Sequence, residues 1–300
     1  MKEKQIYNEI KDKLIDDEVY SRVKDYSKER HRVLTYFEVG KILSDAGKHY
    51  GEDIIGKYSE KLMIDVDKKF NKNTLFKIRK FYVIFSNEKV ATLWPQLTWS
   101  HCKNLISIKN INEINYYINQ IINKNLSVRQ LSDIKKNKEY ERLPNTTKIK
   151  LIENKEQNIK DLIKNPIVIK NTNNYEIINE KVLQKIILED IPSFLKELGD
   201  GFTFIDNEYK IKIGSNYNYI DILLYNYIYK SFTIVELKVT KLKKEHVGQI
   251  HTYMNYIDKN LRTINENNTI GLIICKKNND FIMEYCSDER ILSKEYELIN

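Results

Sequence analysis

Apolar residues recur three and four positions apart along residues 6–140, and few stretches of this half alternate between polar and apolar residues. That spacing places the apolar side chains on one face of a helix. The segment NTLFKIRKFYVIF is the clearest example, and its apolar stripe consists of Leu75, Ile78, Tyr82 and Phe85. We therefore expect the N-terminal half of the chain to be all α.

The polar face of this helix carries Asn73, Lys77 and Lys80, with Arg79 beside them. A shorter helix is expected just before it, around SEKLMIDV, and two such helices can form a helix-turn-helix. The second helix of that motif lies in the major groove of DNA. The pattern therefore predicts a DNA-binding face, with the solvated face of an ordinary amphipathic helix as the alternative.

Two more helices are expected in this half. In LTWSHCKNLISI, Thr98 or the neighbouring Ser100 caps the first of them, and Trp99 lies in the core. His101 is a candidate contact to a DNA phosphate, with a structural histidine beside the tryptophan as the alternative. The segment SVRQL has the Ser-x-x-Gln spacing of a capping box and begins the second helix.

The periodicity then fades in a polar stretch that is rich in Asn, Lys and Thr and contains prolines. Such a composition is typical of a linker between domains. We expect a helical DNA-binding domain over residues 1–145, a linker over 146–165 and a second domain over 166–300. One helix, near residues 150–163, is expected within the linker.

The pattern changes in kind after Glu176. A helix, EKVLQKIILEDIPSFLKELG, is followed by four short runs typical of strands, GFTFI, YKIKIG, YIDILLY and FTIVELK. The short turns between them predict an antiparallel meander. The helix KKEHVGQIHTYMNYIDKNLR separates this meander from TIGLIIC, which is expected to be a buried strand parallel to its neighbour. The fold class is therefore expected to be α+β.

A chain of 300 residues with 41% hydrophobic residues can form two domains, each with its own core. No stretch reaches the roughly 18 apolar residues of a membrane span. The start, MKEKQIYNEIKDKL, is too charged for a signal peptide. We therefore expect a cytoplasmic protein that does not bind membranes. Its three cysteines, Cys102, Cys275 and Cys286, lack a Cys-x-x-Cys spacing and are expected to be reduced and buried.

The formal net charge of +8 comes from the N-terminal half. Residues 1–150 contain 30 Lys and Arg against 20 Asp and Glu, whereas residues 151–300 contain 20 against 22. Lysine and arginine bind polyanions by releasing counterions from phosphates, which favours a nucleic-acid-binding module in the first half. The alternative is a coding bias, because the chain is rich in the Asn, Ile and Lys that AT-rich genes encode.

The strand FTIVELK carries two charges at the end of an apolar run, Glu236 and Lys238, and alternation places both on one face of the strand. The Glu-x-Lys spacing alone is a weak signal, since the chain contains three further copies in polar surroundings. Asp221 also interrupts an apolar run, YIDILLY, and a hairpin brings the two strands together. Two carboxylates and a lysine then converge, where a bound cation would relieve the repulsion between the carboxylates.

That group of residues suits metal-assisted hydrolysis of a phosphodiester. Mg²⁺ prefers oxygen ligands and keeps several waters, so Asp221, Glu236 and the backbone carbonyl of Leu237 can hold it. The ion makes a bound water more acidic and polarises the phosphate, while Lys238 orients the water or offsets developing negative charge. The alternative is an ion-pair network at the edge of the sheet.

Asp221, residues 236–238 and Gln249 on the next helix together resemble the motif of the PD-(D/E)XK nuclease superfamily. The segments IDILLYNYIYKSFTIVELK, KKEHVGQIHTYMNYID and TIGLIIC are similar to the C-terminal nuclease domain of the YhcG-like family. YFEVGKIL, NTLFKIRKFYVIF, QLTWSH and SVRQL are similar to the helical domain before it, which is regarded as a winged-helix-like DNA binder. The resemblance extends over residues 33–285.

The resemblance implies a restriction-endonuclease-like fold for the second domain, an α/β sandwich around a mixed central sheet. It implies that Asp221 and Glu236 are metal ligands and that Lys238 is the catalytic lysine. It also implies supporting roles for Gln249 and Tyr253, which lie four residues apart on one face of the helix.

Two positions depart from the family pattern. Ile220 replaces the proline that gives the superfamily its name, which changes little. Gln184 stands where the first helix of the domain usually has a glutamate, which puts metal affinity or a second metal site in doubt. Glu180 or Glu189 compensates if the alignment shifts.

The resemblance implies a DNA nuclease that depends on Mg²⁺, with Mn²⁺ as a substitute, in the setting of DNA repair, recombination or genome defence. The alternative is a DNA-binding protein with an inactive nuclease-like core that serves for structure or partner contacts, and Gln184 keeps it open. Many nucleases of this fold act as dimers, so a homodimer is open as well.

Overall fold

The computed structural model of the chain describes residues 3–21, 28–51, 53–286 and 288–300. The chain divides into two compact units, Met1–Tyr140 and Glu141–Asn300. Each unit has buried hydrophobic residues of its own. The division falls slightly before the expected end of the first domain at residue 145.

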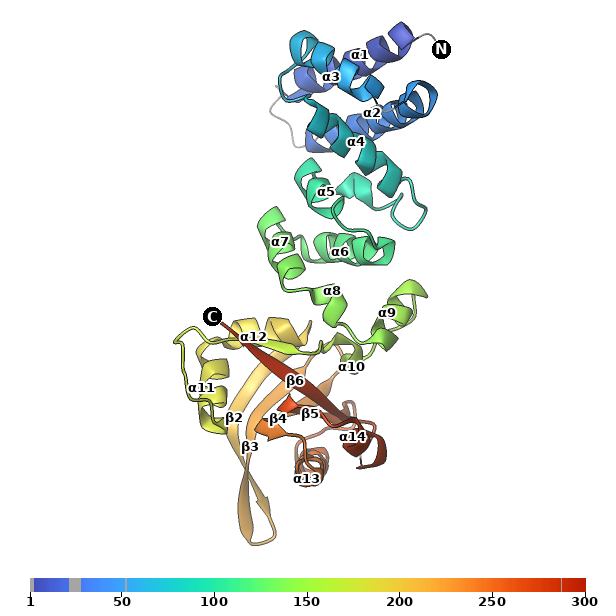
Figure 1. Cartoon of the computed structure of the whole chain (residues 1–300). Helices are drawn as coiled ribbons and strands as arrows, with labels where there is room; N and C mark the ends of the chain where they lie inside the picture. The colour runs from blue at the N-terminus through green and yellow to red at the C-terminus, as the bar shows by residue number, and fades with distance from the viewer. Residues whose placement is uncertain (1–2, 22–27, 52, 287) are drawn as a thin grey trace. The chain divides into compact units, whose positions relative to one another are not determined.

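The first unit is all α in its described residues, as the hydrophobic spacing predicts (Figure 1). No strand occurs among these residues, so they contain no wing of the winged-helix kind. The helices are α1 (Glu3–Ser21), α2 (Lys28–Tyr50), α3 (Asp53–Asp65), α4 (Lys72–Phe85), η1 (Trp94–Gln96), α5 (Trp99–Leu105), α6 (Ile111–Lys124) and α7 (Val128–Lys136), and α8 (Glu139–Arg142) crosses the division.

The buried stripe of α4 differs at one position from the expected one. Leu75, Ile78 and Phe85 are buried as predicted, but the fourth buried residue is Phe81 rather than Tyr82. A step of three from Ile78 to Phe81 and a step of four to Phe85 keep all of them on one helical face. The segment SEKLMIDV lies in α3 except for its last residue, so two consecutive helices are present where a helix-turn-helix is expected.

An aromatic cluster around Trp99 forms part of the core of the first unit. The Trp99 ring centroid lies 4.9 Å from that of Tyr36 and 5.5 Å from that of Phe81. Thr98, not Ser100, caps α5, because its hydroxyl accepts a hydrogen bond from the backbone N–H of His101. The capping box predicted in SVRQL is present at the start of α7.

The second unit contains a six-stranded mixed sheet in the order β1-β6-β5-β4-β3-β2. The strands β1, β6, β5 and β4 are parallel, whereas β3 and β2 pair antiparallel. The strands are β1 (Ile167–Lys170), β2 (Phe202–Ile213), β3 (Asn216–Asn226), β4 (Ser231–Lys241), β5 (Asn267–Lys277) and β6 (Ile291–Ile299). The helices are α9 (Asn145–Ile152), α10 (Ile159–Leu162), α11 (Glu180–Glu189), α12 (Ile191–Leu198), α13 (Lys244–Asn260) and α14 (Asp280–Cys286).

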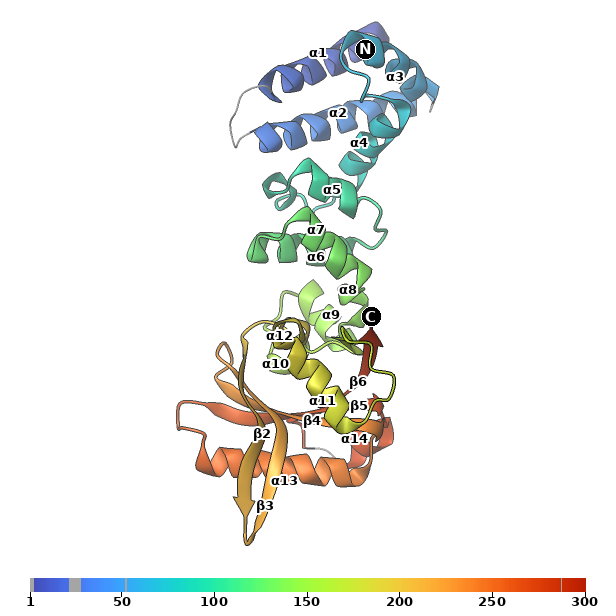
Figure 2. The ribbon, with the colours of Figure 1, turned by 90° about the vertical axis from the view of Figure 1, so that its left-hand side faces the viewer.

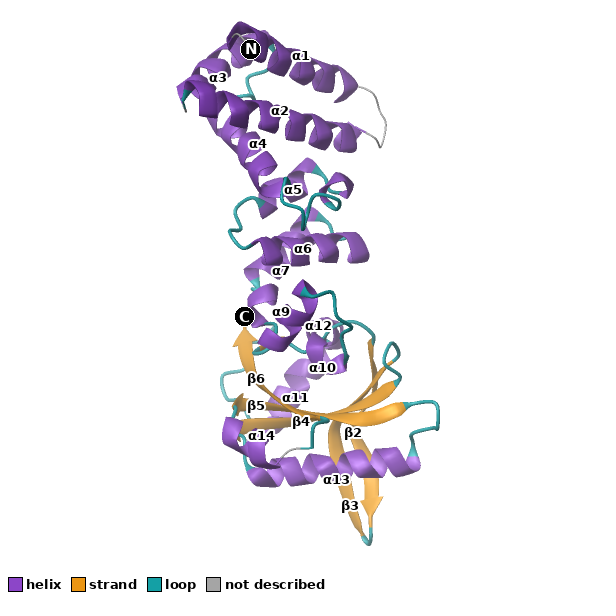
Figure 3. Ribbon diagram, turned by 90° about the vertical axis from the view of Figure 1, so that its right-hand side faces the viewer, coloured by secondary structure: helices purple, strands orange, loops and turns teal. Residues whose placement is uncertain are grey.

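Helices cover both faces of this sheet, with α11 and α12 on one face and α13 on the other (Figures 2 and 3). Leu183 of α11 and Leu237 of β4 belong to the apolar cluster on the first face. Ile250 of α13 and Ile234 of β4 belong to the cluster on the second. Alternate residues of β4 therefore feed two cores, and the expected sandwich around a mixed sheet is confirmed.

Two strand and helix boundaries differ from the expected ones. GFTFI and YKIKIG are parts of one strand, β2, which continues through a register shift between Phe204 and Asp206. The helix predicted from EKVLQKIILEDIPSFLKELG is two helices, because Asp190 ends α11 and its side chain caps α12. The strand TIGLIIC is buried in β5 and parallel to β4, as predicted.

The segment expected to be a linker, residues 146–165, is part of the second unit. It carries most of α9 and all of α10. Ile159 and Ile163 are buried in the same apolar cluster as α11. Arg142, just before this segment, pairs with the carboxylate of Glu197 in α12. A polar composition therefore does not by itself mark a linker, since Ile159 and Ile163 are buried although Ile149 and Ile152 are exposed.

Within the described segments, no helix is both long and apolar enough to cross a membrane. Cys102 and Cys275 are free and buried, as expected. The side chain of Cys286 lies outside the described residues.

Candidate active site

The sheet divides between β3 and β4 at the position of the predicted site. The antiparallel register of these strands ends at the pair Ile222↔Val235. From there, β3 continues in its pairing with β2, and β4 continues in its pairing with β5. We call the point where β3 and β4 separate the fork. Asp221 and Glu236 are the first residues beyond it.

Side chains bind the backbone groups that face the fork. The N–H of Leu237 donates to Oδ2 of Asp221 at 2.8 Å. The carbonyl of Asp221 accepts a hydrogen bond from Nε2 of Gln184 in α11, also at 2.8 Å. Glu208 lies opposite Asp221 on β2, has a φ of 50° and forms no pair in the β2–β3 register. Because buried backbone groups need partners, these two hydrogen bonds stabilise the separation of the strands.

Glu236 and Lys238 lie on one side of β4, as alternation predicts. Oε2 of Glu236 lies 3.4 Å from Nζ of Lys238. Nζ of Lys238 also lies 3.7 Å from Oε2 of Glu180, in the first turn of α11. Glu236 is only 1% exposed, whereas the Glu180 side chain is 47% exposed. The lysine is therefore placed between a buried carboxylate and a carboxylate at the surface.

The two carboxyl groups at the fork are both less acidic than usual. Burial, together with the negative charge of Asp221, raises the pKa of Glu236 to about 8 against the opposing charge of Lys238. Burial also raises the pKa of Asp221, although the Leu237 N–H and the charge of Lys238 oppose the shift. Burial disfavours the charge of Lys238, but Glu236, Glu180 and Asp221 outweigh it, so the pKa of Lys238 lies above its ordinary value.

The supporting residues predicted on α13 contact each other beside the fork. Nε2 of Gln249 donates to the hydroxyl of Tyr253 at 3.1 Å, and Tyr253 is 5% exposed. Burial raises the pKa of the Tyr253 hydroxyl, and the charges of Glu236 and Asp221 add to the increase. Tyr253 therefore lies close enough to Glu236 and Asp221 for their charges to shift its pKa.

The donor set at the fork fits a divalent cation. Oε1 of Glu236 is buried and has no hydrogen-bond partner within the described part of the chain. A cation there would stabilise the ionised forms of both Asp221 and Glu236, whose pKa values are raised. The N–H of Leu237 faces Asp221, and the N–H and C=O of a strand residue face the same neighbour, so the Leu237 carbonyl also faces the fork.

No group of three or more His, Cys, Asp or Glu residues that could hold a metal occurs in residues 3–21, 28–51, 53–286 and 288–300. A divalent cation held by the two fork carboxylates and the Leu237 carbonyl would keep water in its other coordination positions.

Sequence reasoning underrated Glu180 and missed His246. Glu180 and Gln184 lie four residues apart on one face of α11, and they contact Lys238 and Asp221 respectively. Their spacing could have predicted that both side chains point toward the site. His246 lies near Lys238, since burial and then the charge of Lys238 lower its pKa. Nothing in the sequence around His246 distinguishes it from other surface histidines.

In the first unit, the predicted DNA-binding residues are not equivalent. Asn73, Lys77 and Lys80 are exposed on α4. Arg79 is half-buried, and its guanidinium lies against Gly47 of α2. His101 is 8% exposed, and its Nδ1 takes part in the cap of α5 with Thr98. His101 therefore fits the structural alternative, because a buried ring cannot reach a phosphate.

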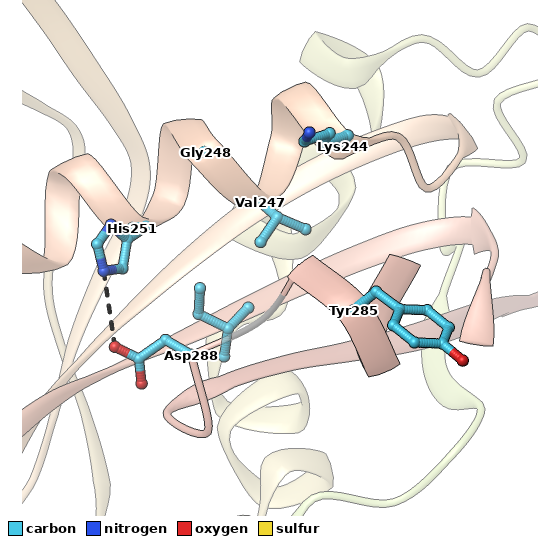
Figure 4. A pocket seen from close by; sticks show the side chains of 7 residues that line it. Lys244, Val247, Gly248, His251, Tyr285 and Asp288 are labelled. Carbon is cyan, nitrogen blue, oxygen red and sulfur yellow. Dashed lines mark ion pairs between the residues drawn. The ribbon is translucent and has the colours of Figure 1, made fainter. Parts of the chain in front are cut away.

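A separate hollow of about 420 Å³ lies between α13 and the segment that carries α14 and the start of β6 (Figure 4). Its lining includes Lys244, Gly248 and Tyr285. Nε2 of His251 faces Oδ2 of Asp288 across it at 3.6 Å. Neither fork carboxylate lines this hollow, so it is distinct from the candidate active site.

Comparison with known proteins agrees with this arrangement. Residues 160–299 match the family described as "YhcG PDDEXK nuclease domain", and residues 18–142 match the "DUF1016 N-terminal domain". The chain belongs to the YhcG-like family. An Escherichia coli (strain K12) relative, described as "Putative nuclease YhcG", is 24% identical over 283 residues, which cover 80% of this chain and 76% of that protein. The second unit of this YhcG-like chain is therefore a nuclease-family domain.

Two solved structures also match part of this YhcG-like chain. One is described as "crystal structure of a repair endonuclease from Pyrococcus abyssi", with 17% identity and a TM-score of 0.29 over 42% of this chain and 49% of that chain. The other is described as "Structure of EndoMS-dsDNA2 complex", with 16% identity and a TM-score of 0.29 over 42% of this chain and 48% of that chain. The match spans about half the length of each.

Proposed function

We propose that this YhcG-like protein is a metal-dependent DNA nuclease whose active site is the fork. The observation that carries the proposal is Glu236, a buried carboxylate with one unpartnered oxygen beside Asp221 and Lys238. Leaving a buried carboxylate partly unpartnered costs stability, so such a group is favoured where a ligand completes it. The match to a nuclease family supports the same conclusion.

Asp221, Glu236 and the Leu237 carbonyl would hold the cation, with Mg²⁺ as the first choice and Mn²⁺ as a substitute. When bound, the cation makes a water more acidic and polarises the scissile phosphate. The protein's part is to place the two carboxylates. The Leu237 N–H holds Asp221 in position, and burial in the sheet holds Glu236.

Lys238 would act as a cation in this reaction. Its raised pKa keeps Nζ protonated at neutral pH, so it donates hydrogen bonds rather than taking a proton. Nζ can orient the attacking water and offset the negative charge that develops on the phosphate oxygens. Gln249 and Tyr253 would support the site from α13, because their mutual hydrogen bond fixes both side chains beside the carboxylates.

The first unit would bind DNA through α4. Asn73, Lys77 and Lys80 form an exposed polar row on the second helix of a consecutive pair. Residues 1–150 also carry the whole positive excess of the chain. Positive charge on an exposed helix favours contact with DNA phosphates. Arg79 would stabilise the contact of α4 with α2 instead of meeting DNA.

Gln184 does not favour the alternative of an inactive nuclease-like core. Its amide donates to the backbone carbonyl of Asp221, a task that an ionised glutamate cannot perform. The residue therefore has a use in shaping the fork that is separate from metal binding.

The test compares cleavage by the wild type and Asp221→Ala on linear, nicked and branched DNA with Mg²⁺ or Mn²⁺. We expect the wild type to cut at least one substrate and the variant to cut none. Equal cleavage by both proteins would indicate a contaminating nuclease. No cleavage by the wild type on any substrate would favour the alternative, a DNA-binding protein with an inactive nuclease-like core.

A further inference from the structure

The β2–β3 hairpin continues well past the fork, and its outer part extends beyond α13 (Figures 1 and 2). We call residues 209–220 the hairpin arm. Its sequence, YKIKIGSNYNYI, contains two lysines and three tyrosines but no Asp or Glu. The second half of the chain has a net negative charge, so this positive segment stands out from its surroundings.

One face of the hairpin arm is fixed to the body of the second unit. Ile211 and Ile220 are buried in the apolar cluster that includes α13, and Tyr209 and Ile213 pack against it. Since strand side chains alternate between faces, this contact also fixes which residues the arm presents on its other side. The arm is therefore an ordered extension of the sheet at these positions.

The outward face of the arm combines lysines with tyrosines. The β2–β3 register pairs Lys210 with Tyr219 and Lys212 with Tyr217, and all four are exposed. Tyr217 and Tyr219 are 56% and 52% exposed. The Nζ of Lys210 lies 3.9 Å from the centroid of the Tyr217 ring, which holds the two side chains together.

The hairpin arm leads to the fork along β3. Asp221 lies two residues after Tyr219, and the strand turns its faces between them, because Ile220 belongs to the α13 cluster and Ile222 to the cluster on the other face of the sheet. At about 3.4 Å per residue, Tyr219 and Tyr217 lie roughly 7 and 14 Å from Asp221 along the strand. Those spans correspond to about two to four nucleotides of rise along one DNA strand.

We propose that the outward face of the hairpin arm binds the phosphate backbone of DNA next to the scissile phosphate. The inference rests on the proposed nuclease function and adds a substrate contact within the second unit. Lys210 and Lys212 meet phosphates, while the exposed tyrosine rings pack against sugars or bases. The charge of the arm is complementary to DNA, and β3 runs directly from the arm to Asp221.

The test measures binding of the full chain to a fluorescent 30-base-pair duplex at several salt concentrations in EDTA, so that no cleavage occurs. For Lys210→Ala with Lys212→Ala, we expect about tenfold weaker binding and a salt slope smaller by about 2, because two phosphate contacts are lost. Tyr217→Leu with Tyr219→Leu is expected to weaken binding while the salt slope stays unchanged.

Two matched variants serve as controls. Lys196→Ala with Lys259→Ala removes the same charge from exposed positions on α12 and α13 and is expected to leave the slope near that of the wild type. Lys210→Arg with Lys212→Arg keeps the charge and is expected to bind within about twofold of the wild type. Thermal unfolding of each variant checks that the cross-strand pairs do not act through stability alone.

The outcomes separate this inference from the proposed function. If the wild type binds duplex and the arm variants bind with the same affinity and slope, the arm is not a DNA contact, and a role in binding another protein takes its place. If both lysine pairs change the slope equally, the effect is one of overall charge and the inference is wrong. If the wild type does not bind DNA at all, the proposed function fails and this inference fails with it.

Discussion

The carboxylate of Asp221 accepts a hydrogen bond of 2.8 Å from the backbone N–H of Leu237 across the fork. The candidate metal ligand therefore also replaces a strand partner, since the β3–β4 register ends one residue before it. Two roles meet in one side chain, and substitutions can separate them because charge and hydrogen bonding differ between Asn and Ala.

Asp221→Asn keeps an oxygen that can accept from Leu237 and removes the charge that repels Glu236. We expect this variant to be at least as stable as the wild type in EDTA. Asp221→Ala leaves the Leu237 N–H without its partner and is expected to lose roughly 1–2 kcal/mol relative to Asp221→Asn. Urea unfolding measures the difference. Equal stability of the two variants would show that the hydrogen bond contributes nothing, and both variants should lack cleavage.

Gln184→Glu tests whether the amide shapes the fork or marks a weakened metal site. An ionised glutamate cannot donate to the Asp221 carbonyl and adds a negative charge beside the buried carboxyl groups of Asp221 and Glu236. We expect lower stability at pH 7, by about 1–3 kcal/mol, and no gain in cleavage at saturating Mg²⁺. Faster cleavage with tighter Mg²⁺ binding would instead place this residue among the ligands.

The stability of the protein should depend on pH through Glu236. Its pKa is about 8 in the folded chain against an ordinary value of 4.5, so between these values the folded state holds a proton that the unfolded state has released. The contribution of Glu236 to the free energy of unfolding is then greatest below about pH 4.5 and is lost as the pH rises through 8. Glu236→Gln has no titrating group at this position, so its stability relative to the wild type should rise by on the order of 5 kcal/mol across this range in EDTA.

Chemical denaturation of both proteins from pH 5 to pH 9 measures this trend. The lost contact with Lys238 adds an offset to the variant, but the offset does not produce the trend with pH. Glu176→Gln, at an exposed position, is the control and should give a constant difference. A constant difference for Glu236→Gln as well would mean that Glu236 is not held protonated in the metal-free protein.

Lys77→Ala with Lys80→Ala tests the DNA-binding face of α4. We expect weaker binding to duplex DNA and a salt slope smaller by about 2, because two exposed lysines are removed. Lys41→Ala with Lys103→Ala removes the same charge from exposed positions outside α4 and serves as the control. An unchanged salt slope for the α4 variant would assign this face to an ordinary solvated helix.

The sequence was sufficient to predict the features that depend on local periodicity. Glu236 and Lys238 share a side of β4 because alternation is fixed by the strand itself. The helix between β4 and β5 predicted that the two strands are parallel, and the observed register confirms it. The resemblance to the family added the identity of the nuclease domain, which the periodicity of the chain does not contain.

The features that depend on tertiary pairing were beyond the sequence. Gln184 was treated as a substituted ligand, and only the fold shows its amide on the Asp221 carbonyl. His101 was a candidate DNA contact until packing placed it in a helix cap. The fork itself arises where the register of β3 with β4 ends, and no local pattern marks that position.

The most direct test of the nuclease site is the rate of DNA cleavage by the wild type and by Glu236→Gln as Mg²⁺ is titrated from EDTA to millimolar concentrations. Glutamine has nearly the size of glutamate but removes the charge of the buried ligand. We predict no cleavage by the wild type in EDTA, a rate that rises with Mg²⁺, and a rate at least about 100-fold lower for the variant, comparable to the loss of a transition-state electrostatic contact. Cleavage by Glu236→Gln at the wild-type rate, or cleavage by the wild type in EDTA, would contradict the proposed nuclease site.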